Sequence, residues 1–213
     1  MSATAVRDAY VDGLIDRHGR DVYERLARAR VAIAGLGGLG SHIAFALTRL
    51  GVGHLRLIDF DIVEMCNLNR QNYLLRHIGM PKTEALAEQL TAISPLTTVD
   101  IVTVKLTPDN VPTLLSGFDV VCEAFDLADQ KAMLVSSLLA DVPDTPLVSG
   151  SGMAGYGSSN TITTRRALDR LYLAGDLESG ATAGRGLMAP RVQLCAAHQA
   201  NAVLRLLLGH ADV

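Results

Sequence analysis

The sequence has few cysteines, and none of them is paired by spacing. Its three cysteines, Cys66, Cys122 and Cys195, are odd in number and far apart, so a disulfide framework is not expected. There is no C-x-x-C motif to hold a structural zinc ion, and we expect no zinc site. Each cysteine is more typical of a small buried hydrophobic residue in a reducing compartment.

Long apolar runs and an excess of basic charge are also missing. No stretch approaches the roughly 18 apolar residues that can cross a bilayer, and the polar first dozen residues lack the apolar core of a signal peptide. The formal net charge is -3, with no run of Lys or Arg, so a broad contact with nucleic acid is not expected. We therefore expect a cytoplasmic protein with neither a membrane nor a nucleic acid as partner.

What the sequence does contain is a regular alternation of apolar strand and helix patterns. With 213 residues and 49% hydrophobic side chains, it fits a single domain with a substantial core. We predict an α/β fold, a Rossmann-like, doubly wound and mainly parallel sheet flanked by helices. The predicted strands are 31–34, 54–59, 98–104, 118–122 and 145–149, and the helices between them are 41–50, 82–93 and 128–140.

The two ends of the chain depart from this alternation. Residues 1–28 are predicted as a helical leader of one or two helices, before a nucleotide-binding core at 29–149. Residues 150–186 are rich in glycine and lack periodicity, which indicates a flexible crossover loop over the site or a set of short strands. A C-terminal helix is predicted at 187–209, with Gly209 as its cap.

A glycine-rich turn joins the first predicted strand to the first core helix. Its spacing is that of a dinucleotide fingerprint, in which glycines allow a tight turn, close approach to phosphates and close helix packing. Asp59 follows 19 residues after the last glycine, at the end of the second strand, where a carboxylate can accept hydrogen bonds from ribose hydroxyls. The predicted nucleotide-binding residues here are Gly35, Gly37, Gly38, Leu39, Gly40 and Asp59. This fingerprint alone leaves NAD, FAD and ATP open.

A polar cluster downstream favours ATP. Arginine offers a planar donor fork, lysine a point charge, and amides neutral donors, which together suit a triphosphate. Arg70 and Lys82 would neutralise the charge that develops on leaving pyrophosphate; taken singly, each is more typical of a solvated surface cation. The predicted ATP-binding residues of this cluster are Asp61, Asn67, Asn69, Arg70, Gln71 and Lys82.

Asp126 follows the predicted strand 118–122, at the carboxyl edge of the sheet. A carboxylate there could hold Mg²⁺, which prefers oxygen ligands and bridges phosphates. It could equally cap the helix that begins near Ala128. From spacing alone the two readings are even.

These motifs together resemble the ThiF/MoeB/HesA family, the prokaryotic relatives of ubiquitin-activating enzymes. The resemblance rests on the glycine loop with Ser41, the Asp59-Phe60-Asp61 segment, Asn67-Leu-Asn-Arg-Gln71, Gly79-x-x-Lys82 and Asp126, and it returns after Leu187. It implies that MgATP adenylylates the C-terminal carboxylate of a small β-grasp sulfur-carrier protein ending in Gly-Gly, with release of pyrophosphate.

The resemblance also implies a role for each matched residue. Asp59 would bind ribose, Asn67, Arg70, Gln71 and Lys82 would contact phosphates, and Asp126 would be linked to magnesium. Arg70, Lys82 and Asp126 are therefore the predicted catalytic residues. The family tends to form homodimers in which an N-terminal arginine reaches the partner's ATP, and Arg17 or Arg20 could serve here, although the leader matches the family poorly.

The sequence departs from the family pattern at three places. Zinc-binding cysteine pairs are missing, Leu127 stands where an Asn is common, and the 150–185 segment contains no cysteine for a covalent link to the carrier. We therefore expect adenylation without a thioester or persulfide on this chain. The short length favours the variant that acts in thiamine thiazole synthesis.

Other functions remain open at this point. The alternatives are another ubiquitin-like carrier in a molybdopterin or cysteine pathway, a threonylcarbamoyl-adenosine tRNA dehydratase, and a nucleotide-binding module without turnover. The net negative charge disfavours an RNA substrate.

Overall fold

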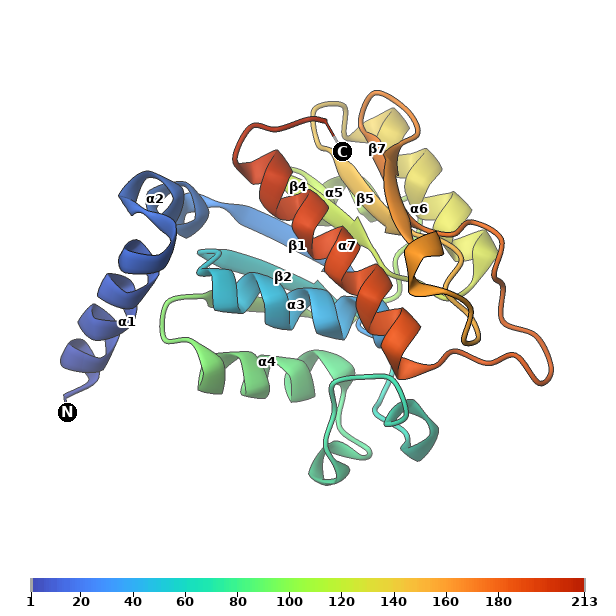
Figure 1. Cartoon of the computed structure of the whole chain (residues 1–213), viewed down its shortest axis with the longest axis horizontal. Helices are drawn as coiled ribbons and strands as arrows, with labels where there is room; N and C mark the ends of the chain where they lie inside the picture. Colours follow the sequence, from blue (N-terminus) through green and yellow to red (C-terminus); the bar gives the residue numbers. More distant parts are fainter. Residues whose placement is uncertain (1, 213) are drawn as a thin grey trace.

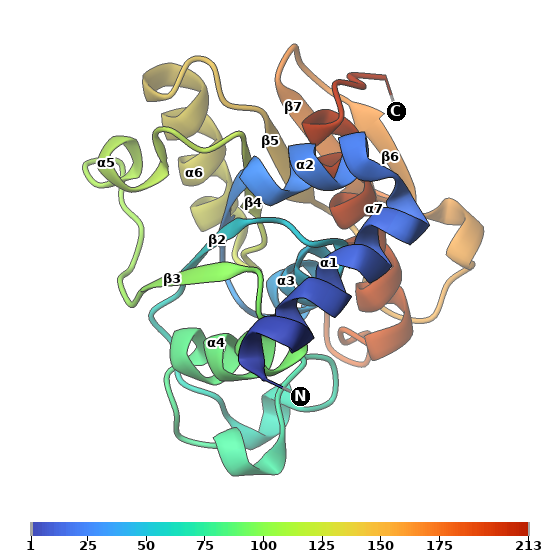
Figure 2. The ribbon, with the colours of Figure 1, turned by 90° about the vertical axis from the view of Figure 1, so that its left-hand side faces the viewer.

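The computed structural model describes residues 2–212, which begin with two helices that precede the sheet. Helix α1 (Ala3–His18) projects from the body of the molecule, and α2 (Arg20–Arg28) packs on the end of the sheet (Figures 1 and 2). Gly19 separates them with φ 83°, a conformation that suits glycine. Leu14 is the one buried side chain of α1, so most of that helix faces solvent.

The centre of the fold is a seven-stranded sheet in the order β3-β2-β1-β4-β5-β7-β6. Every neighbouring pair is parallel except β6 with β7. The prediction of a mainly parallel, Rossmann-like sheet is therefore confirmed. The strands are β1 (Arg30–Ala34), β2 (His54–Ile58), β3 (Thr98–Val102), β4 (Val120–Glu123), β5 (Leu147–Gly150), β6 (Thr163–Arg166) and β7 (Leu171–Gly175).

Helices cover both faces of the sheet. On one face lie α3 (Gly38–Leu50), α4 (Lys82–Ile93) and α7 (Ala189–Leu207), and on the other lie α5 (Val111–Leu115) and α6 (Ala128–Asp141) (Figure 1). Strand β1 shows why: Val31 and Ile33 pack into the first layer, while Ala32 and Ala34 pack into the second. Alternate residues of a strand face opposite sides, so a strand buried on both faces is apolar throughout.

The structure differs from the sequence-based prediction mainly outside the central strands. Helix α3 begins at Gly38 rather than at residue 41, and α5, which is only five residues long, was not predicted. Of the two readings of 150–186, short strands hold for β6 and β7. Strand β6, Thr-Thr-Arg-Arg, is largely exposed at the sheet edge, so it carries no apolar alternation. Short 3-10 helices occupy Met65–Asn67, Leu75–His77 and Ser159–Thr161.

The strand order has a reversal point that positions a ligand site. Strand β1 pairs with β2 on one side and with β4 on the other. The strands that follow β1 are therefore added first on one side of it (β2, β3) and then on the other (β4, β5). In open α/β sheets ligands bind in the crevice beyond the carboxyl ends of the strands at such a point. Within residues 2–212, no helix has both the length and the apolar character needed to cross a membrane.

Candidate nucleotide site

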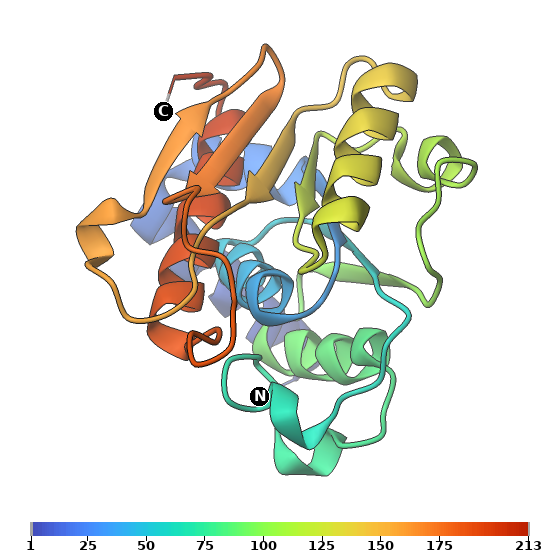
Figure 3. The same cartoon turned by 90° about the vertical axis from the view of Figure 1, so that its right-hand side faces the viewer.

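A cavity of about 930 Å³ lies at the carboxyl edge of the sheet. Figure 3 looks toward this end of the molecule, where the first turn of α3 stands between the 60–80 segment, the start of α6 and the segment after β7. The lining comes from all of these parts of the chain. Among the residues predicted for the site, those that line it are Gly35, Gly37, Gly38, Leu39, Asp59, Asp61, Asn69, Arg70, Gln71, Lys82 and Asp126.

Two glycines shape the turn before α3. Gly35 has φ 90°, and a Cβ there would meet the Ala124 carbonyl oxygen at 2.8 Å. A Cβ on Gly40 would fall 1.8 Å from the Gly35 carbonyl oxygen. Gly40 does not line the cavity, so its position requires glycine for packing of the helix against the loop rather than for contact with a ligand.

The N-terminal end of α3 offers unpaired donors to the cavity. Its N-cap, Gly37, provides no side-chain cap, and the backbone N–H groups of Gly37, Gly38 and Leu39 have no acceptor within residues 2–212. These three residues line the cavity. Free N–H groups and the positive end of the helix dipole together favour an anion such as phosphate.

Asp59 is held in place beside this turn. Its Oδ2 accepts a hydrogen bond from the Leu36 N–H at 2.7 Å, and its Oδ1 accepts one from the Asp61 N–H at 2.8 Å. Only 8% of the residue is exposed. Burial raises the pKa of Asp59, although the nearby Lys82 ammonium and the two N–H groups oppose that rise. The two hydrogen bonds fix the carboxylate at the cavity wall.

Lys82 begins α4 and is buried, but its charge is already paired. Its Nζ lies 2.8 Å from Asp61 Oδ2. The sequence predicted Lys82 as a phosphate contact without anticipating this ion pair. Since both residues line the cavity, a bound anion would compete with Asp61 for the ammonium.

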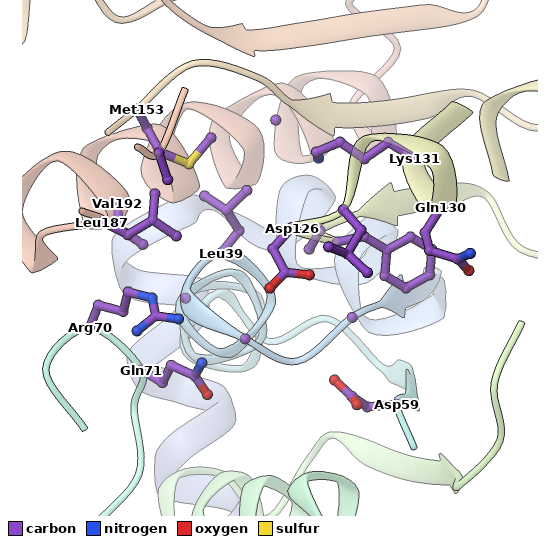
Figure 4. Close-up of a pocket in the computed structure, with 18 of the residues that line it drawn as sticks. Leu39, Asp59, Arg70, Gln71, Asp126, Gln130, Lys131, Met153, Leu187 and Val192 are labelled. Atoms are coloured by element: carbon purple, nitrogen blue, oxygen red, sulfur yellow. The ribbon is translucent and has the colours of Figure 1, made fainter. Parts of the chain in front are cut away.

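Arg70, in contrast, forms no ion pair within the described part of the chain. Its Nη1 donates to the Cys66 carbonyl at 3.3 Å and to Asn69 Oδ1 at 2.9 Å. Its neighbour Gln71 is buried beside Gly37. Figure 4 shows the Arg70 guanidinium and the Gln71 amide on the same side of the cavity.

Asn67, which the sequence assigned to phosphate, is placed outside the cavity lining. Its Oδ1 accepts from the Glu64 N–H at 3.0 Å, and it ends the short 3-10 helix Met65–Asn67. Its amide is thus used to shape the loop that presents Arg70. Arg17 and Arg20 also lie away from their own chain's cavity, because α2 leads into the amino end of β1. Their role toward a partner chain stays a prediction.

Asp126 lies between β4 and α6 with its carboxylate directed into the cavity (Figure 4). The N-cap of α6 is Leu127, and no side chain caps that helix, so the capping alternative is not seen. Residues 2–212 contain no cluster of three or more His, Cys, Asp or Glu side chains that could enclose a metal ion. One exposed carboxylate still fits Mg²⁺, which commonly takes one or two carboxylates together with substrate phosphates and waters.

Sequence reasoning missed a buried charge network on the α6 side of the cavity. The carboxylate of Glu123, which is fully buried, accepts two hydrogen bonds from Lys131 Nζ, both at 2.9 Å, and one from Ser149 Oγ at 2.5 Å. Oε1 also accepts from the Phe125 N–H at 2.7 Å. Lys131 lines the cavity. A glutamate inside an apolar strand was the one available signal, because a buried carboxylate needs a partner.

The segment between β5 and α7 closes another side of the cavity. It contributes Gly150 to Met153, Ser179 to Ala181, Gly186 and Leu187 to the lining. Arg191, at the start of α7, fastens this segment through an ion pair with Asp176 at 2.5 Å, and Asp176 Oδ1 accepts from the Ser179 N–H at 2.7 Å. The contact of Arg191 with Asp176 joins residues 15 positions apart in sequence, so no local pattern predicts it.

Known proteins are similar to this chain in sequence and in structure. Residues 12–213 match the family model described as the ThiF family. The chain is 32% identical over 191 residues to molybdopterin-synthase adenylyltransferase of Salmonella typhimurium, covering 86% of this chain and 75% of that protein. It is 37% identical over 140 residues to tRNA threonylcarbamoyladenosine dehydratase of Escherichia coli, covering 65% of this chain and 52% of that protein.

A solved structure of that dehydratase, in complex with ATP, gives a TM-score of 0.82 at 25% identity, with 94% of each chain covered. By sequence, however, the chain spans only about half the length of the curated dehydratases that it matches.

Proposed function

Because this chain belongs to the ThiF family, we propose that it uses ATP to adenylylate a carboxylate. The products are an acyl-adenylate and pyrophosphate. The substrate we propose is the C-terminal Gly-Gly carboxylate of a small, ubiquitin-like β-grasp sulfur-carrier protein.

The observation that carries the proposal is one cavity with three complementary parts. The free N–H groups at the start of α3 suit a phosphate, the fixed carboxylate of Asp59 suits a ribose, and Arg70 brings a positive charge without an ion-pair partner. A side wall containing Val104, Leu106 and Phe125 offers apolar surface for an adenine ring.

The reaction needs charge stabilisation more than acid–base chemistry. A carboxylate is already an anion at neutral pH, so its oxygen attacks the α-phosphorus directly, a new O–P bond forms and the bond to pyrophosphate breaks. The barrier includes repulsion between the carboxylate and the phosphates. Arg70, Lys82 and the end of α3 would offset the negative charge and hold the reacting groups in line.

Asp126 would hold Mg²⁺ through its free carboxylate. When bound, the ion would neutralise phosphate charge as a Lewis acid. Asp126 has no hydrogen-bond partner among the described residues that would compete for this role.

The finer assignments rest on the sequence pattern. We propose a carrier in thiamine thiazole synthesis, and a homodimer in which Arg17 or Arg20 reaches the partner's nucleotide. The homodimer is supported by the exposed helix α1, because Arg17 is solvent-exposed near the end of that helix. The alternative is a carrier of a molybdopterin or cysteine pathway.

The cysteines favour release of the adenylate without a covalent link to this chain. Burial raises the pKa of the Cys122 thiol, and it raises that of Cys195 to about 12. Both would stay protonated and poorly nucleophilic at neutral pH. Cys66 is exposed but does not line the cavity.

ATP–pyrophosphate exchange tests the proposal directly. Wild-type protein should exchange labelled pyrophosphate into ATP only when a carrier with a free C-terminal Gly-Gly is added. Arg70→Ala should lower the exchange rate by about 10²–10³-fold, the usual effect of removing one donor that stabilises developing charge. Arg76→Ala is the matched control, because Arg76 lies in the same segment, pairs with Glu88 on the surface and does not line the cavity.

Failure of wild-type exchange with carriers from all three pathways would refute the carrier assignment. Equal activities of the two arginine variants would remove Arg70 from the mechanism.

A second candidate, activation of the carboxylate of threonylcarbamoyladenosine in tRNA, is favoured by the similarity to the E. coli dehydratase. The net charge of -3 argues against a large RNA contact. Incubation with ATP and tRNA, followed by mass spectrometry of the nucleosides, separates the two. Loss of one water from the modified adenosine would support the dehydratase, whereas an unchanged nucleoside with carrier-dependent exchange would support the carrier.

A further inference from the structure

The loop that presents Arg70 and Gln71 has no regular secondary structure, yet it must hold a guanidinium beside the glycine turn. Arg70 lies between the 3-10 helices Met65–Asn67 and Leu75–His77. Hydrogen bonds inside the loop, such as those from Arg70 to Cys66 and Asn69, shape it locally. These bonds do not hold the loop against α3, so another contact must set the distance between Arg70 and that helix.

That contact comes from Ser41 and His42, two residues in the first turns of α3. Ser41 Oγ donates to the Gly37 carbonyl at 2.7 Å and accepts from the Asn72 N–H at 3.1 Å. His42 Nε2 lies 3.2 Å from the Arg70 carbonyl oxygen, and His42 Nδ1 lies 2.7 Å from Asn72 Nδ2.

The partners of His42 define its protonation state. The Arg70 carbonyl can only accept, so Nε2 carries the proton, and the Asn72 amide nitrogen can only donate, so Nδ1 offers a lone pair. The neutral imidazole meets both demands at once. Burial lowers the pKa of His42, which also favours the neutral ring.

Asn72 is fixed from a second side. Its carbonyl accepts from Gln89 Nε2 on α4 at 2.7 Å. The residue directly after Gln71 is therefore tied to α3 through its N–H and its side chain, and to α4 through its carbonyl. Arg70 itself is held to α3 through its carbonyl, which contacts His42.

We propose that His42 is a positioning residue for the adenylation reaction, which sets Arg70 against the N-terminal end of α3 so that both act on the same phosphate. This role rests on the proposed function. Because α3 both presents its own N–H groups to the cavity and holds the Arg70 backbone, the two anion-binding elements move as one body. His42 does not line the cavity, so it acts through Arg70.

The first test is steady-state ATP–pyrophosphate exchange by full-length His42→Ala. Loss of alignment by about 1 Å can cost on the order of 100-fold in rate, so we expect kcat to fall about 10–100-fold. The KM for ATP should change less than about threefold, because Asp59 and the end of α3 remain. His198→Ala is the matched control: this half-buried histidine bonds Thr164 at 2.9 Å, away from the cavity, and the variant should retain wild-type kcat.

Two conservative variants separate the contacts of His42. His42→Gln can place an amide N–H near the position of Nε2 and should restore most of kcat through the Arg70 carbonyl. His42→Asn can replace only the acceptor for Asn72 and should restore less. In an Arg70→Ala background, His42→Ala should have no further effect, since a residue that acts through Arg70 has nothing left to position. Additive losses would overturn the proposal.

A second measurement does not depend on activity. Amide hydrogen exchange of residues 67–72 should become at least about tenfold faster in His42→Ala, with the β1 and β4 amides unchanged. Unchanged amide exchange in residues 67–72 would overturn the positioning role of His42, even if the protein adenylylates no carrier. If wild-type protein shows no pyrophosphate exchange while amide exchange of residues 67–72 becomes faster in His42→Ala, the proposed function fails. The role of His42 in holding this loop is then still supported.

Discussion

The buried pair of Glu123 and Lys131 allows a quantitative prediction for Lys131→Met. Glu123 is fully buried, and the Lys131 side chain is 21% exposed. Removing one partner of a buried ion pair costs about 3–5 kcal/mol, because the other charge stays buried without compensation. Bonds from Phe125 N–H and Ser149 Oγ remain, so we expect a loss of about 3 kcal/mol in the free energy of unfolding. For a chain of this size that is roughly 6–12 °C in Tm.

Urea unfolding followed by far-UV circular dichroism measures this loss, since the chain has no tryptophan to report by fluorescence. The double variant Glu123→Gln/Lys131→Met removes both charges and should unfold within about 1 kcal/mol of wild type. Arg28→Met is the surface control: its pair with Glu24 spans 3.8 Å with side chains 74% and 47% exposed, and it should change stability by less than about 0.5 kcal/mol. A single variant as stable as wild type, or a double variant less stable than the single, would refute the reasoning.

Gly40→Ala should lower the free energy of unfolding by about 2–3 kcal/mol and weaken ATP binding, because its Cβ would lie 1.8 Å from the Gly35 carbonyl oxygen. Gly13→Ala, with nothing within 4 Å of the new Cβ, should instead stabilise α1 by up to about 1 kcal/mol; equal effects in urea unfolding would contradict both. The raised pKa of Asp59 means that its ionised form is disfavoured by folding, so protonation on acidification begins above the ordinary value of 3.8 and removes an acceptor for ribose. The affinity for ATP, measured by calorimetry, should therefore fall as the pH drops toward that value. The Asp59→Asn variant should bind ATP more weakly at neutral pH, and its affinity should lack that pH dependence.

The sequence predicts those parts of this fold whose cause is local. Strand β1 is apolar at every buried position, the glycine turn follows it directly, and Asp59 follows directly after β2. Adjacency along the chain therefore places the glycine turn and Asp59 at one edge of the sheet. The same reasoning could have found Val104 and Leu106, which follow β3 and line the cavity.

Features that depend on distant partners could not be predicted in this way. Strand β6 is a polar edge strand that forms only because β7 is available to pair with it. The contact of His42 with Arg70 joins residues 28 positions apart, and that of Arg191 with Asp176 joins residues 15 apart. Asn67 shows a further limit of local patterns: its position in a polar motif suggested a phosphate contact, whereas in this structure its side-chain oxygen accepts from the Glu64 N–H and the residue does not line the cavity.

The cations that line the cavity differ in how free their charges are. Lys82 is paired with Asp61, and Lys131 is paired with Glu123. Lys105 lies 5.8 Å above the Phe60 ring, on the wall that we assign to the adenine. Arg70 thus contributes a guanidinium charge that no acid of residues 2–212 neutralises, beside the free N–H groups of α3. A triphosphate gains most from charges that are not already compensated, so loss of Arg70 should exceed loss of Lys82 in its effect on exchange.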